Sequence, residues 1–92
     1  METILKIPLR IIKEQELVIG PLAWEEAKKV TGLTIDQSHE SVSFTGDGKD
    51  VTNRLVAQYE RIFGQASHEV CRDAVQDLIA EMRPDEVPES LK

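Results

Sequence analysis

The chain has 92 residues and a formal net charge of −6, with 40% hydrophobic and 30% charged residues. These values indicate one small globular domain, and they disfavour general binding of nucleic acid, duplex DNA included, or of anionic membrane surfaces. The single cysteine, Cys71, excludes an internal disulfide, and no apolar run approaches the ~20 residues of a membrane span. Because the first residues, METILKIPLRIIKEQE, lack the features of a signal peptide, we expect a cytoplasmic protein.

The first half of the chain predicts strands around one helix. Apolar residues alternate with Lys6, Pro8 and Arg10 over residues 5–11, which predicts an edge or bulged strand because Pro8 cannot donate a ladder hydrogen bond. Residues 17–19 predict a second short strand. A helix over residues 9–19 is the alternative, which the β-branched content disfavours.

The stretch GPLAWEEAKKVTG, residues 20–32, predicts a helix. Pro21 suits its first position, Gly20 the cap before it and Gly32 its end. The next stretch, LTIDQSHESVSFTGDGKD, predicts a strand, a turn and a strand, followed by a second turn that ends at a helix cap, Asp50.

Residues 51–82 have a helical pattern with Gly64 in the middle. The apolar stripes before and after Gly64 are out of register by about one residue, roughly 100° of rotation. We therefore predict a joint at Gly64, giving two helices or one kinked helix. The predicted fold is α+β: a small antiparallel sheet, one short helix and a C-terminal helical pair within residues 1–83, followed by a flexible acidic tail over residues 84–92.

Three features could suggest chemistry, and each has a simpler interpretation. His68 and Cys71 stand three residues apart, but a structural zinc site needs four ligands, and a free cysteine in an apolar stripe is typical of core packing. The TGDGKD turn departs from a phosphate-binding loop, since Ser43 replaces its first glycine and Asp50 follows Lys49. The stretch EEAKKVTGLT is similar to the start of a helix-turn-helix, but QSHES makes a poor second helix. We expect no catalytic residue, cofactor or metal.

Polar residues at steps of four and three form the most distinctive pattern. On a continuous helix they would line one face with no acidic residue, which is unusual in a chain of charge −6. A solvated helix face is the simpler interpretation, and a docking face for an acidic or phosphate-bearing partner is the functional one. The possible partner-binding residues are Arg54, Gln58, Arg61, Gln65, His68 and Arg72, with Gln76 one step further on.

The second apolar stripe predicts self-association. Its width exceeds what one packing surface needs, so a homodimer is expected, with a monomer covered by the helix around Trp24 as the alternative. The possible self-association residues are Val70, Ala74, Val75, Leu78, Ile79 and Met82.

The segment LVAQYERIFGQASHEVCRDAV, residues 55–75, resembles a helical module attached to bacterial signalling proteins, including cyanobacterial response-regulator and kinase-type chains. The matching positions are Tyr59, Phe63, Gly64 and Ala66, where an aromatic-Gly-x-Ala step joins two amphipathic helices. The resemblance implies an interaction module in bacterial signalling rather than an enzyme. We therefore expect a non-catalytic protein-protein interaction or regulatory module with an unknown protein partner. The alternatives are a nucleic-acid-binding regulator that uses Arg54, Arg61 and Arg72, and a small ligand-binding protein.

Overall fold

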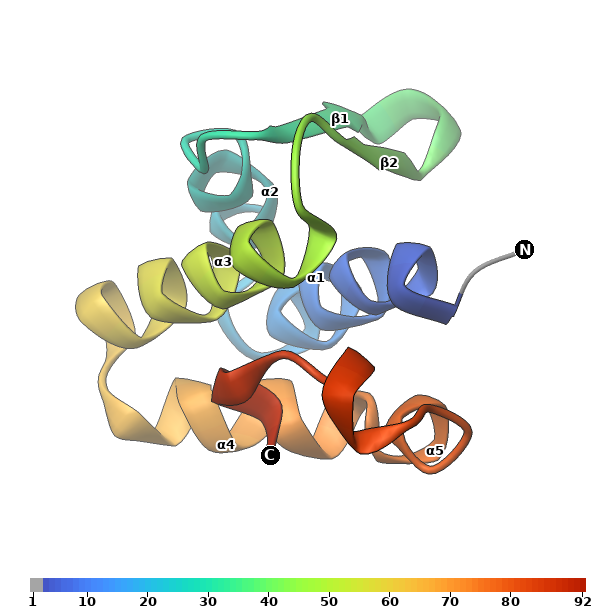
Figure 1. Cartoon of the computed structure of the whole chain (residues 1–92). Helices are drawn as coiled ribbons and strands as arrows, with labels where there is room; N and C mark the ends of the chain where they lie inside the picture. Colours follow the sequence, from blue (N-terminus) through green and yellow to red (C-terminus); the bar gives the residue numbers. More distant parts are fainter. Residues whose placement is uncertain (1–2) are drawn as a thin grey trace.

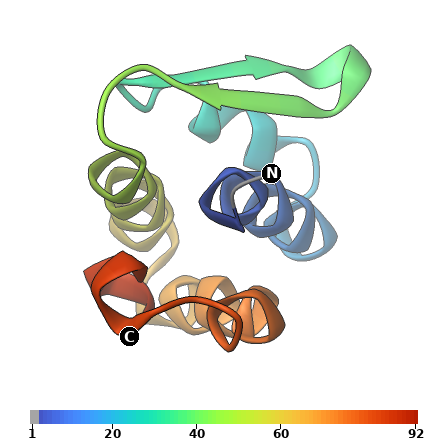
Figure 2. The ribbon, with the colours of Figure 1, turned by 45° about the vertical axis from the view of Figure 1, so that its right-hand side comes forward.

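The computed structural model describes residues 3–92 and has an α+β fold in which helices predominate (Figure 1). Helices α1, α3 and α4 surround the core, and a β-hairpin lies over the side of α1 and α3 that is opposite α4 (Figure 2). The helices are α1 (Ile7–Ile19), α2 (Leu22–Ala27), α3 (Gly48–Phe63), α4 (Gln65–Ala74) and α5 (Gln76–Ile79). The strands are β1 (Leu33–Asp36) and β2 (Ser41–Phe44), and short 3-10 helices are η1 (Thr3–Lys6), η2 (Gln37–His39), η3 (Pro84–Glu86) and η4 (Glu89–Leu91).

The predictions of strands at residues 5–11 and 17–19 are wrong, because this region forms η1 and α1. Pro8 lies in the first turn of α1, where a missing backbone N–H costs nothing. Ile7, Ile11 and Ile12 recur at helical spacing and are fully buried, whereas Leu5 is 38% exposed. Burial of one helical face therefore outweighs the β-branched preference, and the expected four-stranded sheet is a two-stranded one.

The strand-turn-strand prediction for residues 33–44 is confirmed. Strands β1 and β2 pair antiparallel, with Leu33 opposite Phe44 and Asp36 opposite Ser41. The side chain of Asp36 accepts a hydrogen bond from the backbone N–H of His39, which closes the turn. Because Leu33 is buried and Phe44 packs against the core, the inner face of the hairpin covers the helices.

The predicted helix after Pro21 is confirmed as α2, but it ends at Ala27, before Gly32. The cap of α3 also differs from the prediction: Asp47, rather than Asp50, accepts a hydrogen bond from the backbone N–H of Lys49 at 3.0 Å. Helix α3 therefore begins at Gly48, three residues earlier than expected.

The predicted joint at Gly64 is confirmed. Gly64 has φ 89° and ψ −179°, a conformation that L-residues rarely adopt, and it separates α3 from α4. Its backbone N–H donates to the carbonyl of Glu60 and thereby closes the last turn of α3. The chain then reverses, so that α4 runs back beneath α3 and α1 (Figure 1).

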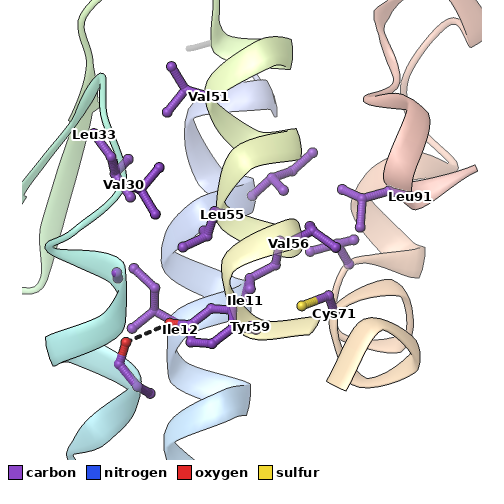
Figure 3. Packing of buried hydrophobic residues seen from close by; sticks show 14 of the residues in the cluster. Ile11, Ile12, Val30, Leu33, Val51, Leu55, Val56, Tyr59, Cys71 and Leu91 are labelled. Carbon is purple, nitrogen blue, oxygen red and sulfur yellow. Dashed lines mark hydrogen bonds between the residues drawn. The ribbon is translucent and has the colours of Figure 1, made fainter. Parts of the chain in front are cut away.

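The core lies between these helices and is mostly aliphatic (Figure 3). Tyr59 is fully buried, and its hydroxyl donates to the backbone carbonyl of Ala23 at 2.6 Å, which ties α3 to α2. Residues 84–92 are placed on the core rather than apart from it, which differs from the expected non-helical, flexible tail. They form η3 and η4, and Val87 and Leu91 are only 5% and 3% exposed.

Candidate functional site

The joint at Gly64 divides the predicted polar stripe between two helices. Arg54, Gln58 and Arg61 remain on α3, while Gln65, His68 and Arg72 lie on α4 and Gln76 begins α5. The structure therefore does not bring all the predicted partner-binding residues onto one face. The two parts also differ in what their side chains contact.

In the α4 part of the stripe, His68 is used inside the molecule. The His68 ring lies with Nε2 against the backbone carbonyl of Ser90 and with Nδ1 3.3 Å from the carboxylate of Glu60. Arg72 pairs with Glu69 at 3.5 Å on the same helix. The two contacts of His68 hold the C-terminal segment and α3 to α4, whereas Gln65 and Gln76 are exposed.

The α3 part of the stripe faces the segment that follows α2, residues 29–31, across a shallow cavity of about 300 Å³. We call this the α2–α3 groove and define it by its lining residues: Lys29, Val30, Thr31, Arg54, Ala57, Gln58 and Arg61. One guanidinium N–H of Arg54 donates to the carbonyl of Thr31 at 3.1 Å, and one of Arg61 donates to the side-chain oxygen of Gln58 at 2.8 Å. Both acceptors are neutral, so neither arginine gives up its charge to the contact.

Within residues 3–92, Arg54 and Arg61 have no carboxylate partner. The other three arginines form ion pairs: Arg10 with Asp77 at 2.9 Å, Arg72 with Glu69 at 3.5 Å and Arg83 with Asp85 at 3.5 Å. The two unpaired arginines of this acidic protein's described region thus lie on one helix. They are seven residues apart, which is about 10 Å along the helix axis. The arrangement leaves two guanidinium groups available to carboxylates from outside the chain.

Glu26 is an acidic side chain beside this groove, and both of its carboxylate oxygens already accept hydrogen bonds. The side chain is 10% exposed, and it accepts hydrogen bonds from Gln58 Nε2 at 2.7 Å and from Lys29 Nζ at 3.1 Å. The hydrogen bond from Gln58, followed by that from Lys29, holds the pKa of the Glu26 carboxyl below its usual value. Glu26 therefore stays ionised and fixed between α2 and α3, while the two arginines remain available.

The residues predicted for self-association are turned toward the chain's own core. Val75 is fully buried and Leu78 is 5% exposed. Val70 is half-buried, and Ala74, Ile79 and Met82 are partly buried, the last three packed against the same core. The premise that this stripe leaves apolar surface uncovered is therefore wrong, because α1 and the C-terminal segment cover much of it. The structure carries no support for a homodimer through these residues.

Cys71 lies in the core, as the packing interpretation predicts. Its side chain is fully buried, and the Gln15 side-chain amide donates to its Sγ at 3.3 Å. Burial raises the pKa of the Cys71 thiol to about 11, so the thiol is protonated near neutral pH. Within residues 3–92, no group of three or more His, Cys, Asp and Glu side chains could hold a metal ion.

The other two sequence features are structural. The TGDGKD turn connects β2 to α3 and supplies the cap Asp47. The stretch after α2 forms the hairpin with its 3-10 turn, so no second helix of a helix-turn-helix follows α2. A larger cavity of about 470 Å³ lies near the start of α3, where carboxylates outnumber Lys49, and Lys49 already donates to the backbone carbonyl of Asp85.

Sequence reasoning missed the part of the groove that the segment after α2 supplies. Lys29 and Thr31 were considered only as part of the helix predicted over residues 20–32, and so was Leu22. The opposite charges of Glu26 and Arg61 are a weak sequence signal that α2 packs against α3. Comparison of the chain with protein-family models, curated proteins and solved structures finds no match. Within residues 3–92, no helix combines the length and the apolar character needed to cross a bilayer.

Proposed function

We propose that this protein is a non-catalytic docking or regulatory module that binds an acidic region of a partner protein in the α2–α3 groove. The observation that carries the proposal is the pair of arginines, Arg54 and Arg61, which lack a carboxylate partner within residues 3–92 of an acidic chain. Lys29 adds a third cation at the same groove, although it also bonds Glu26. The partner would therefore present at least two carboxylates.

The position of the two guanidinium groups supports this role. Each is held by a neutral hydrogen bond, which orients the side chain without neutralising it. Preoriented arginines form bidentate contacts with carboxylates at a smaller entropic cost than free ones. Since exposed ion pairs contribute about 0.2–1 kcal/mol each, the groove alone predicts a weak, salt-sensitive complex.

Two further proposals accompany this function. The expected place in bacterial signalling follows from the resemblance of residues 55–75, and the joint at Gly64 that carries the resemblance also determines which polar residues remain on α3. A cytoplasmic location is supported by the free, buried thiol of Cys71, which needs no oxidising compartment.

The test is a titration with a fluorescein-labelled oligoglutamate peptide, followed by fluorescence anisotropy at low and at physiological salt. We expect the double variant Arg54→Gln/Arg61→Gln to weaken binding about tenfold, because it removes both charge-assisted contacts. The matched control is Arg72→Gln/Arg83→Gln, which removes the same charge elsewhere and should change binding less than about twofold.

Equal losses in the two double variants would contradict the proposal, since binding would then depend only on net charge. The nucleic-acid alternative is tested with a labelled DNA duplex in the same assay. We expect no binding below the micromolar range at physiological salt, because a chain of charge −6 repels the phosphate backbone. Tighter binding that is lost in Arg54→Gln/Arg61→Gln would favour the alternative instead.

A further inference from the structure

The α2–α3 groove does not end at its arginines. Level with Arg61 along α3 lie two large apolar side chains with high exposure, Leu22 at 52% and Ile62 at 47%. Both stand at helix ends, Leu22 at the start of α2 and Ile62 near the end of α3. Exposed apolar side chains are common one at a time, but a pair beside a charged groove is a feature of binding surfaces.

The contacts between α2 and α3 predict that this pair lies close together. The two helices run antiparallel, because Arg54 bonds Thr31 while Gln58, further along α3, bonds the earlier residue Glu26. Residues four apart lie on the same side of a helix, one turn away. Ile62 is one turn beyond Gln58, and Leu22 is one turn before Glu26. The pair therefore occupies the next position along the same interface, at the Arg61 end.

From this arrangement we infer that the groove binds an amphipathic helix of the partner, with two acidic residues about two turns apart and a leucine-type side chain next to the acidic residue that contacts Arg61. The inference rests on the proposed function and adds an apolar anchor to it. Two acidic residues seven positions apart on a helix match Arg54 and Arg61, which are also seven positions apart, about 10 Å along the axis of α3. The apolar side chain then lies over Leu22 and Ile62.

An anchor of this kind changes how strongly the groove binds. Exposed ion pairs are weakened by salt, whereas burial of a leucine side chain is not. Anchor residues in apolar pockets carry much of the affinity of peptide complexes, while charges at the rim determine specificity and encounter rate. The acidic residues would thus select the partner and the apolar residue would hold it.

The probes are two labelled helical peptides on an alanine-glutamine scaffold, each with two glutamates seven positions apart. In one, a leucine directly follows the second glutamate; in the other, it directly precedes the first, which covers the reverse direction. We expect one of them to bind at physiological salt and its leucine-to-alanine form to bind about tenfold more weakly.

Variants of the protein locate the anchor. Leu22→Ser/Ile62→Ser should weaken the leucine peptide about tenfold, down to the level of the alanine peptide. The matched control is Leu5→Ser/Leu17→Ser, which removes two exposed apolar side chains from η1 and α1 and should leave binding unchanged. Circular dichroism of each variant establishes that it is folded, because all four positions are at least 38% exposed.

The outcomes separate this inference from the proposed function. If both peptides bind equally well with leucine or alanine, but Arg54→Gln/Arg61→Gln abolishes binding, the groove binds acidic segments and the anchor is refuted. If neither Arg54→Gln/Arg61→Gln nor Leu22→Ser/Ile62→Ser weakens binding, both the inference and the proposed function are refuted. If light scattering shows a dimer that Leu22→Ser/Ile62→Ser dissociates, a second copy of this chain covers the pair, and the inference is overturned.

Discussion

Replacement of Gly64 by alanine tests the joint between α3 and α4. At φ 89° and ψ −179°, the backbone of Gly64 is in a region that is nearly restricted to glycine, where other residues lose about 1–3 kcal/mol. A Cβ added at Gly64 meets no atom within 4 Å, so the cost is conformational strain rather than collision. Alanine also reduces the entropy of the unfolded chain, which offsets about 0.4–1 kcal/mol.

We therefore expect Gly64→Ala to lower the free energy of unfolding by about 1–2 kcal/mol. For a domain of this size, that corresponds to a fall in Tm of roughly 4–16 °C. Urea denaturation followed by circular dichroism measures the change, and calorimetry gives the Tm independently. Gln65→Ala, one residue further on and exposed at the start of α4, is the control and should change stability by less than about 0.5 kcal/mol.

A Gly64→Ala protein as stable as the wild type would refute this reasoning. An increase in helical signal would be stronger still, because it would mean that α3 and α4 join into one straight helix. In that case the polar stripe would be continuous, and the division between α3 and α4 would not hold.

The remaining predictions concern the C-terminal segment and two titrating side chains. Leu91→Ala should lower the free energy of unfolding by about 2–3 kcal/mol, because Leu91 is 3% exposed; a urea titration showing no loss would mean that the segment is not part of the core. Cys71→Ala should cost about 1–2 kcal/mol near neutral pH. Burial raises the pKa of the Cys71 thiol from 9.0 to about 11, so the stabilising contribution of Cys71 is complete below pH 9 and is lost as pH rises through 11. The free energy of unfolding should therefore fall less between pH 9 and pH 11 in Cys71→Ala than in the wild type. The pKa of Glu26 is lowered from 4.5, so its contribution is present above pH 4.5 and disappears as pH falls through the lowered value; Glu26→Gln should flatten this acid limb in urea titrations at several pH values.

Local signals predicted the elements whose boundaries depend on one or two residues. The joint followed from Gly64 between two apolar stripes, and the hairpin followed from alternation in the stretch that became β2. Both are determined by backbone preferences within a few residues, which a sequence displays directly.

The N-terminal helix was mistaken because its pattern fits two periods. Ile7 and Ile11 are four apart, so they share a face in a helix as well as in a strand. Pro8 was interpreted as an edge-strand residue, although the first turn of a helix suits it equally well. The decision depends on burial of Gln15 against α4, where its side-chain amide donates to the Ser67 carbonyl, a contact between segments more than 50 residues apart. Residue patterns alone do not contain that information.

The candidate site was predicted in part for the same reason. The spacing of Arg54, Gln58 and Arg61 was visible in the sequence, but which arginines would stay unpaired was not. For Arg54 that outcome depends on where the segment after α2 packs, since Thr31 becomes its neutral acceptor. The neutral acceptor of Arg61 is Gln58, three residues earlier on α3. The adjacency of Leu22 and Ile62 has no sequence signal, because it follows only from the antiparallel contact of α2 with α3.

The joint at Gly64 and the proposed docking role are linked by geometry. On a straight helix, the polar residues from Arg54 to Arg72 would form one face about 27 Å long, with each cation equally open to solvent. The reversal of the chain at Gly64 instead brings His68 to the Ser90 carbonyl and to Glu60, where it holds the C-terminal segment on the core. In the half of the stripe on α4, His68 is thereby used for stability, and the half on α3 is left with unpaired guanidinium groups beside an apolar pair. A backbone conformation that only glycine tolerates well thus determines which polar residues hold the fold together and which remain for a partner.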